Sequence, residues 1–189
     1  SSLREVGTTN RTHISDYFNA INNRTKLILK VHTSNYVVRG FTKSIDLSEL
    51  VSLGKKKNIP VMVDWGSGSL LKRGINNLSL DIPINRLMSK NPDLITFSGD
   101  KLIGGPQSGI IVGKTKIIDC LQKNTIYRTI RCDKLTIGLL EETLRSYRSN
   151  SVSEDNLALK MLSTSRSTLR LRGKKILELL NKDKIADLN

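Results

Sequence analysis

Hydrophobic residues are concentrated in short runs that polar, turn-forming stretches separate. Four of these runs are rich in Ile, Leu and Val: 26–32 (KLILKVH), 61–65 (VMVDW), 93–98 (DLITFS) and 108–113 (SGIIVG). Short, continuous apolar runs are typical of strands that lie buried in a sheet. We therefore predict one strand at each run.

Helical patterns lie between and after these runs. In 46–57, Asp46 precedes Glu49 by three positions, as in a capping box, and a proline opens 83–90. Further helices are predicted over 114–123, 135–147, 154–163 and 166–181. Because strands and helices alternate, the predicted fold class is α/β with a mostly parallel sheet.

A polar, serine-rich stretch, RSNSVSEDN, divides the chain at 148–156. We predict a large domain over 1–148, followed over 149–189 by a linker and the start of a small C-terminal domain. With 38% hydrophobic and 25% charged residues, the composition is that of a globular protein rather than a disordered one.

Several classes of protein are excluded by what the sequence lacks. No run approaches the roughly 20 apolar residues of a membrane helix, and the polar opening is unlike a signal peptide. Cys120 and Cys132 lie 12 positions apart without a C-x-x-C motif, so no metal site is predicted. We expect a reduced, cytoplasmic protein with no membrane partner.

The charge is strongly basic. Lys and Arg exceed Asp and Glu by 31 − 17 = 14, an excess that attracts polyanions. Residues 160–175 hold six basic side chains and no acidic one. This segment is either a solvated helix face or a surface that contacts RNA.

Polar side chains follow the predicted strands at the points where they end. They are His32 and Asn35 after the first strand, Asp64 at the end of the second, and Ser98, Asp100 and Lys101 after the third. Ligands of parallel α/β sheets bind at the carboxyl ends of the strands. We therefore expect these side chains to converge on one crevice.

The chemistry of this set centres on Lys101. A lysine in a partly desolvated crevice loses its proton more readily and becomes a nucleophile, which suits a Schiff base with pyridoxal phosphate. That cofactor needs a carboxylate at its pyridine nitrogen, which Asp64 can supply. Ser98 and Asn35 can donate hydrogen bonds to the phosphate and the ring oxygen. His32, at the end of the first strand, is also predicted to bind the cofactor. Taken alone, however, Lys101 would be an ordinary surface lysine.

Longer blocks of sequence resemble one enzyme family. They are LREVGTTNRTHISDY, KVHTSNYVVRGF, DWGSGSL, TFSGDKLIGGPQSGIIVGK and YRTIRCDKLTIGLLEETLRSY, spread over roughly residues 2 to 148. These blocks resemble the bacterial selenocysteine synthases, the L-seryl-tRNA(Sec) selenium transferases. Asp64 also precedes Lys101 by 101 − 64 = 37 positions, close to the separation of the aspartate and lysine in fold-type-I pyridoxal-phosphate enzymes.

The resemblance implies a fold-type-I large domain that uses pyridoxal phosphate. It implies conversion of seryl-tRNA(Sec) to selenocysteinyl-tRNA(Sec), with selenophosphate as the selenium donor. Lys101 would carry the cofactor, and Asp64 would pair with its pyridine nitrogen. The resemblance also implies a homo-oligomer, since the family builds rings of dimers.

Further site residues follow from the same resemblance. Arg128 and Arg131 match the family's anion-binding arginines, and guanidinium groups three positions apart can share a helical or turn face that suits a phosphate. We group Asp100 with them as substrate-binding. Residues placed near subunit contacts are Thr8, Thr9 and Tyr36.

Two alternatives remain open at the level of the sequence. The first is another fold-type-I enzyme such as a cysteine desulfurase, which also has an asparagine shortly after a strand-end histidine. Against it, Lys101 follows Asp100 rather than a histidine. The second is an inactive, truncated remnant of the synthase that retains RNA binding.

Overall fold

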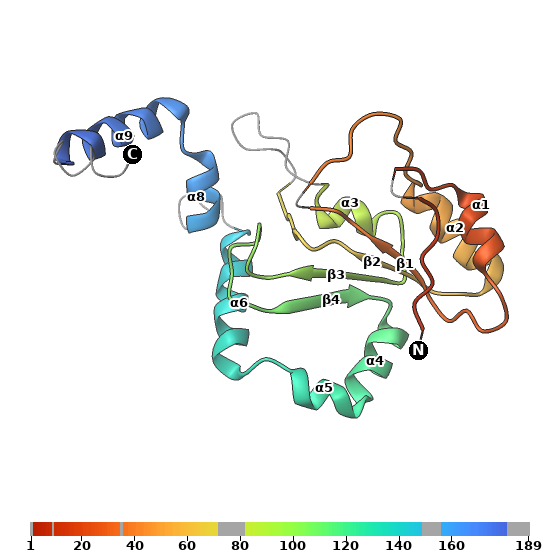
Figure 1. Cartoon of the computed structure of the whole chain (residues 1–189). Helices are drawn as coiled ribbons and strands as arrows, with labels where there is room; N and C mark the ends of the chain where they lie inside the picture. Colours follow the sequence, from red (N-terminus) through yellow and green to blue (C-terminus); the bar gives the residue numbers. More distant parts are fainter. Residues whose placement is uncertain (1, 9, 35, 72–81, 149–155, 181–189) are drawn as a thin grey trace.

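The sheet has four strands in the order β1-β2-β3-β4 (Figure 1). The computed structural model describes residues 2–8, 10–34, 36–71, 82–148 and 156–180. The strands are β1 (Ile28–Val31), β2 (Val61–Asp64), β3 (Leu94–Ser98) and β4 (Gly109–Gly113). The pairs β1–β2 and β2–β3 are parallel and the pair β3–β4 is antiparallel. The predicted α/β class with a mostly parallel sheet is therefore confirmed.

The predicted helix after β1 is observed as α2 (Leu47–Lys57). The Asp46 side chain caps it by accepting a hydrogen bond from the backbone N–H of Ser48, and Asn58 ends it in the left-handed conformation with φ of 53°. Helix α2 packs on β1 and β2. Leu50 of α2, together with Val63 and Ile95 of the sheet, is almost fully buried and forms part of the core.

The remaining helices are short or lie outside this core. Two of them, α1 (Ile14–Ala20) and α5 (Thr125–Ile130), are not predicted from the sequence. They have two turns or fewer and no buried residue, so no apolar periodicity marks them. The others are α3 (Ile84–Met88), α4 (Thr115–Lys123), α6 (Lys134–Ser146), α8 (Leu157–Ser163) and α9 (Arg166–Leu179).

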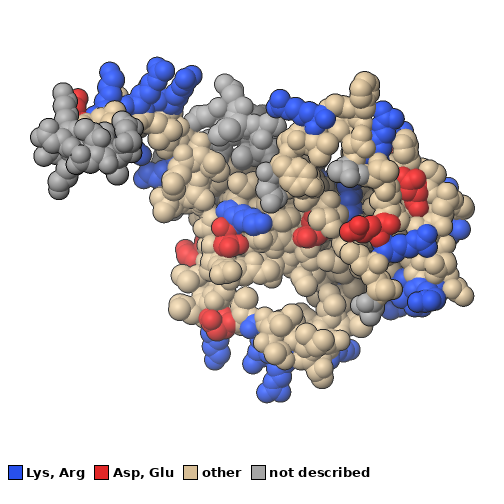
Figure 2. Space-filling model, viewed as in Figure 1, with Lys and Arg blue, Asp and Glu red and all other residues tan. Residues whose placement is uncertain are grey.

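The side of the sheet next to β4 is open. Helices α4, α5 and α6 contain no buried residue, and exposed and half-buried positions alternate along β4. The space-filling view shows an opening between these helices and the sheet (Figure 2). Large apolar side chains on the three helices are exposed, for example Ile130 and Leu135. This side therefore presents an apolar surface that the described residues do not cover.

Most of the predicted linker lies outside the described residues. Its last residue, Asn156, is buried and caps α8 by accepting a hydrogen bond from the backbone N–H of Leu159. This burial of Asn156 is not expected of a residue in a solvated linker. Within the described ranges, no helix is long and apolar enough to cross a membrane.

Candidate functional site

The parallel register brings the carboxyl ends of three strands together. Asp64 lies opposite Val31 of β1 and opposite Thr96 of β3. The backbone continues this pairing beyond the strands, because the N–H of His32 donates to the carbonyl of Asp64 over 2.9 Å. The N–H of Trp65 likewise donates to the carbonyl of Thr96 over 2.8 Å. The segments that follow β1, β2 and β3 therefore begin side by side.

The carboxylate of Asp64 is held by a neighbouring strand. The hydroxyl of Thr96 donates to its Oδ1 over 3.0 Å, and both side chains are partly buried. Thr96 is missing from the set predicted from the sequence. It lies inside β3 rather than after it, so the pattern of polar residues at strand ends does not include it.

The ammonium group of Lys101 lies where the strand-end segments meet. A Cβ atom placed on Gly66, directly after β2, would be 3.5 Å from Lys101 Nζ and 4.0 Å from the hydroxyl oxygen of Ser34. An alanine at position 66 would therefore be in van der Waals contact with the ammonium group. The single chain brings the lysine to the segment that follows Asp64.

The expected desolvation of this lysine is not observed. Lys101 and Asp100 are both exposed. The sequence predicts a partly closed crevice, but in this chain the turn after β3 lies at the surface. Ser98, at the end of β3, is half-buried. Asn35 lies outside the described residues.

The segment after Asp64 contains buried polar atoms that suit a polar ligand. Ser67 and Ser69 are buried, and their hydroxyl groups have no hydrogen-bond partner among the described residues. The same holds for the indole Nε1 of Trp65. A buried polar atom left unpaired costs free energy, about 1–3 kcal/mol, so such atoms mark places where a ligand can bind. This donor set, next to a carboxylate and an amine, fits pyridoxal phosphate.

His32 stacks on Trp65. The ring centroids are 3.7 Å apart, and the planes differ by 11°. The stack fixes the imidazole beside the end of β2. Trp65 is not among the residues predicted from the sequence, although it directly follows Asp64.

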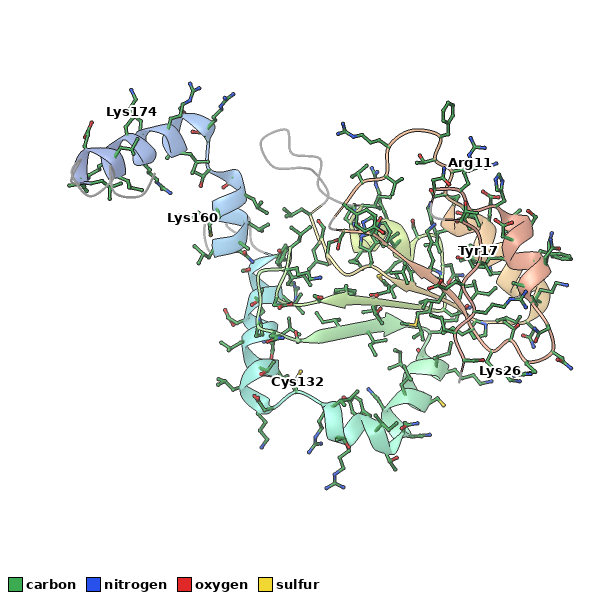
Figure 3. All side chains as sticks on the ribbon, in the orientation of Figure 1. Arg11, Tyr17, Lys26, Cys132, Lys160 and Lys174 are labelled. Atoms are coloured by element: carbon green, nitrogen blue, oxygen red, sulfur yellow. The ribbon has the colours of Figure 1, made fainter. Side chains whose placement is uncertain are left out.

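The two arginines predicted to bind anions lie in and directly after α5, which contacts α4, the helix that follows β4 (Figure 1). Arg128 is in α5 and Arg131 is its C-terminal cap, with an extended backbone (ψ of 142°), and both are exposed. Figure 3 labels the next residue, Cys132, on the link between α5 and α6. The contacts within this chain do not join either arginine to Lys101 or Asp64. Their role in anion binding stays a prediction.

Two residues missed by the sequence analysis bind the turn that carries Lys101. The hydroxyl of Tyr147 lies 3.1 Å from the carbonyl oxygen of Leu102 and 2.9 Å from that of Ile103. The side-chain amide of Asn156 donates to the carbonyl of Ile103 over 2.6 Å. Burial raises the pKa of Tyr147 to about 12, so its hydroxyl keeps its proton at neutral pH.

The residues predicted to contact other subunits are exposed where they are described. Tyr36 is 61% exposed, and Thr8 lies in a turn in which its hydroxyl donates to the carbonyl of Arg11 over 2.8 Å. Thr9 lies outside the described residues. Their part in subunit contacts stays a prediction.

The shape of the surface does not by itself select this site. A groove of about 630 Å³ lies between α1 and α2, and one of about 600 Å³ lies along α9. Neither is lined by Lys101 or Asp64. The first is mainly apolar, with Ile14, Phe18 and Leu53 among its lining residues. The candidate site is therefore defined by the polar side chains at the strand ends and not by a groove.

Comparison with solved structures shows the same fold in another protein. The chain is similar to D-glucosaminate-6-phosphate ammonia-lyase, with a TM-score of 0.60 and 22% identity. The likeness covers 77% of this chain and 36% of that one. At this identity it shows the fold alone, and it is consistent with the fold-type-I architecture expected from the sequence.

Comparison of sequences identifies the family. The family model for SelA, L-seryl-tRNA selenium transferase, matches residues 1–189. The L-seryl-tRNA(Sec) selenium transferase of Escherichia coli O45:K1 is 47% identical over 176 residues, and that of Escherichia fergusonii is 46% identical over 177. Each alignment covers 93% of this chain, which spans 38% of the length of these relatives. The resemblance is confirmed, a cysteine desulfurase is not favoured, and the chain belongs to the L-seryl-tRNA selenium transferase family.

Proposed function

We propose that this chain carries the pyridoxal-phosphate site of an enzyme that converts L-seryl-tRNA(Sec) to L-selenocysteinyl-tRNA(Sec), with selenophosphate as selenium donor. The observation that carries the proposal is the position of Lys101 Nζ, 3.5 Å from the Cβ position of Gly66, on the segment that follows Asp64. The direct test supplies the protein with the cofactor, the charged tRNA and selenophosphate. Selenocysteinyl-tRNA is the expected product, and its absence would support an inactive remnant.

Some residues of the site would bind the cofactor, and others would control the positions of protons. When bound, pyridoxal phosphate supplies an electron sink for negative charge at the α-carbon of the seryl group. The amine of Lys101 would hold the cofactor through its aldehyde carbon, with release of water, and could carry a proton to or from the substrate. Asp64, fixed by Thr96, would stabilise a proton on the ring nitrogen. The hydroxyl groups of Ser67 and Ser69 can donate to the cofactor's oxygen atoms.

We also propose that Arg128 and Arg131 bind the anionic selenium donor. Guanidinium groups form charge-assisted, forked hydrogen bonds with phosphate oxygens. Both side chains are exposed and neither forms an ion pair among the described residues. They are therefore available to an anion, and Asp100 is placed with them as substrate-binding.

The variant Arg131→Ala should weaken binding of selenophosphate, or of a thiosulfate mimic, about tenfold or more. One charge-assisted hydrogen bond contributes roughly 1.5–3 kcal/mol, which corresponds to that change. Cofactor binding should survive. Arg145→Ala is the matched control, because that arginine is exposed on α6 and pairs with Glu141 over 2.6 Å. Loss of cofactor binding with unchanged anion affinity would reverse the proposed roles.

The exposed apolar surface supports a homo-oligomer. Tyr36 belongs to a segment in which Val37 is 79% and Phe41 is 84% exposed. The backbone carbonyl of Phe41 accepts a hydrogen bond from Arg11 Nε over 3.0 Å, so the segment is held against Arg11 of the N-terminal part of the chain. Together with the uncovered faces of α4–α6, these residues suit contact with further copies of the chain. We propose a ring of dimers, as in the family.

Residues 160–175 are proposed as an RNA-binding segment. Arg166, Arg170 and Lys174 are spaced by four positions on α9, so they lie on one face of the helix. All three are exposed, and Figure 2 shows blue side chains gathered along α9.

We also propose that the chain divides into a large domain over 1–148 and a C-terminal part over 149–189, and that the protein is cytoplasmic.

Binding of tRNA should fall steeply as salt rises, because each neutralised phosphate releases counterions. The double variant Arg166→Gln, Arg170→Gln should lower the slope of log affinity against log salt by about 1.4–1.8, since each lost phosphate contact removes about 0.7–0.9. A filter-binding salt series measures this slope.

The control for the salt series lies on the same helix. Arg172→Gln with Lys175→Gln removes the same charge from other faces of α9, and should reduce the slope less. Affinity that is flat from low to moderate salt in the unsubstituted protein would contradict the assignment of residues 160–175 to RNA.

A further inference from the structure

The turn that carries Lys101 is closed by its own backbone. The N–H of Gly104 donates to the carbonyl of Lys101 and that of Gly105 to the carbonyl of Gly99, each over 2.9 Å. The N–H of Leu102 reaches across to the carbonyl of Ser67 over 3.1 Å. These bonds do not use the carbonyls of Leu102 and Ile103, which accept from groups elsewhere in the chain.

Those two carbonyls are bound from the C-terminal part of the chain. Tyr147 caps the end of α6, and its hydroxyl can donate its one proton to Leu102 or Ile103. Asn156 donates to Ile103 from the start of α8. Ile103 is fully buried and Asn156 is 5% exposed, so this contact is shielded from water. Hydrogen bonds in such surroundings are stronger and costly to leave unmade.

Gly104 makes the contact with Asn156 possible. Its φ of 70° lies in the left-handed region, and an added Cβ would lie 2.3 Å from Asn156 Oδ1. A residue with a side chain would be strained there and would also displace the asparagine. The glycine next to Ile103 therefore admits the side chain that holds the turn.

We propose that Tyr147 and Asn156 are positioning residues for Lys101. The side chain of Lys101 is exposed, so its direction depends on the backbone of the turn rather than on packing around the amine. The two hydrogen-bonding side chains fix that backbone one and two residues after the lysine. They thereby hold Nζ beside Gly66, on the segment that follows Asp64. This inference rests on the proposed role of Lys101 in binding pyridoxal phosphate.

The test uses two substitutions that keep the size of each side chain. Tyr147→Phe removes the hydroxyl alone. Asn156→Asp removes the donor to Ile103 but keeps an oxygen to accept from Leu159 N–H and cap α8. In the double variant, apparent affinity for pyridoxal phosphate should fall about tenfold or more, because one hydrogen bond is lost and the other is replaced by repulsion between a carboxylate and the carbonyl of Ile103. Visible circular dichroism per lysine-bound cofactor should also fall, because the cofactor is held less firmly.

Matched controls separate positioning from a general loss of stability. Tyr17→Phe removes a half-buried hydroxyl that donates to Leu29 over 3.4 Å, and Asn124→Asp alters the cap of α5. Both should leave cofactor affinity and dichroism unchanged. Hydrogen exchange of the Gly104 and Gly105 amides should quicken in the double variant and stay unchanged in the controls.

The outcomes distinguish this inference from the proposed function. Quicker exchange in the turn with unchanged cofactor affinity and dichroism would give Tyr147 and Asn156 a structural role only and overturn the inference. Equal losses in the control variants would overturn it as well. If the unsubstituted protein forms no covalent bond with the cofactor, the proposed function itself fails, and the inference fails with it.

Discussion

Replacing Lys101 with arginine is expected to abolish covalent attachment of pyridoxal phosphate. Arginine keeps the positive charge at the end of β3 but cannot lose its proton and attack the cofactor's aldehyde. The visible absorption of the lysine-bound cofactor should therefore disappear. Turnover of seryl-tRNA should disappear with it, because the site would lose the group that binds the cofactor covalently.

The matched control is Lys116→Arg, an exposed lysine on α4. It should retain the absorption band and the turnover of the unsubstituted protein. A band of undiminished strength in the Lys101→Arg variant would show that another lysine binds the cofactor. That result would remove the basis of the proposed site.

Replacing Asp64 with asparagine is expected to lower turnover by about 100-fold while the cofactor stays attached to the lysine. An amide cannot stabilise a proton on the pyridine nitrogen as a carboxylate does, and a neutral ring is a poorer electron sink. Loss of one charge-assisted hydrogen bond of roughly 1.5–3 kcal/mol accounts for an effect of this order. Single-turnover rates at saturating cofactor measure it.

Two further variants define the role of Asp64. Thr96→Val removes the hydroxyl that orients the carboxylate and should lower turnover less than Asp64→Asn does. Asp119→Asn, an exposed aspartate on α4, should have no effect. Full activity of Asp64→Asn would show that this carboxylate does not contact the cofactor.

The strands could be predicted because each is a continuous apolar run between turn-forming residues. This pattern held for β1, β2 and β3, which the sheet pairs in parallel. It predicted β4 as well, although β4 is antiparallel and half exposed. Runs of this kind specify extended backbone, but they do not specify the direction of pairing. The helices α1 and α5 were missed because a helix of two turns or fewer with no buried face leaves no periodic signal.

The strand-end residues of the candidate site could be predicted for the same reason that the sheet could. Parallel strands place their carboxyl ends at one edge, and Asp64 and Lys101 follow from that rule. Tyr147 and Asn156 could not be predicted, because they bind backbone carbonyls 44 to 53 residues away. A bond to a carbonyl depends on the path of the chain and not on the identity of the residue that accepts.

The exposure of Lys101 shows a second limit of the sequence. The burial of a residue depends on all the groups packed around it. The pattern of residues at strand ends carries no information about those groups. The same holds for Arg128 and Arg131, whose family match gives their chemistry but not their distance from Lys101. The uncovered faces of α4–α6 lie beside these arginines in the fold, so we expect their role to depend on contact with a further copy of the chain.

The most direct test of the central claim is to identify the residue that binds the cofactor. The protein is mixed with pyridoxal phosphate and treated with borohydride, which makes the bond to the lysine permanent, and its peptides are then mapped by mass spectrometry. We expect the phosphopyridoxyl group on Lys101, within the sequence GDKLIGGPQ. Labelling of a different lysine, or no labelling above that of a denatured control, would contradict it.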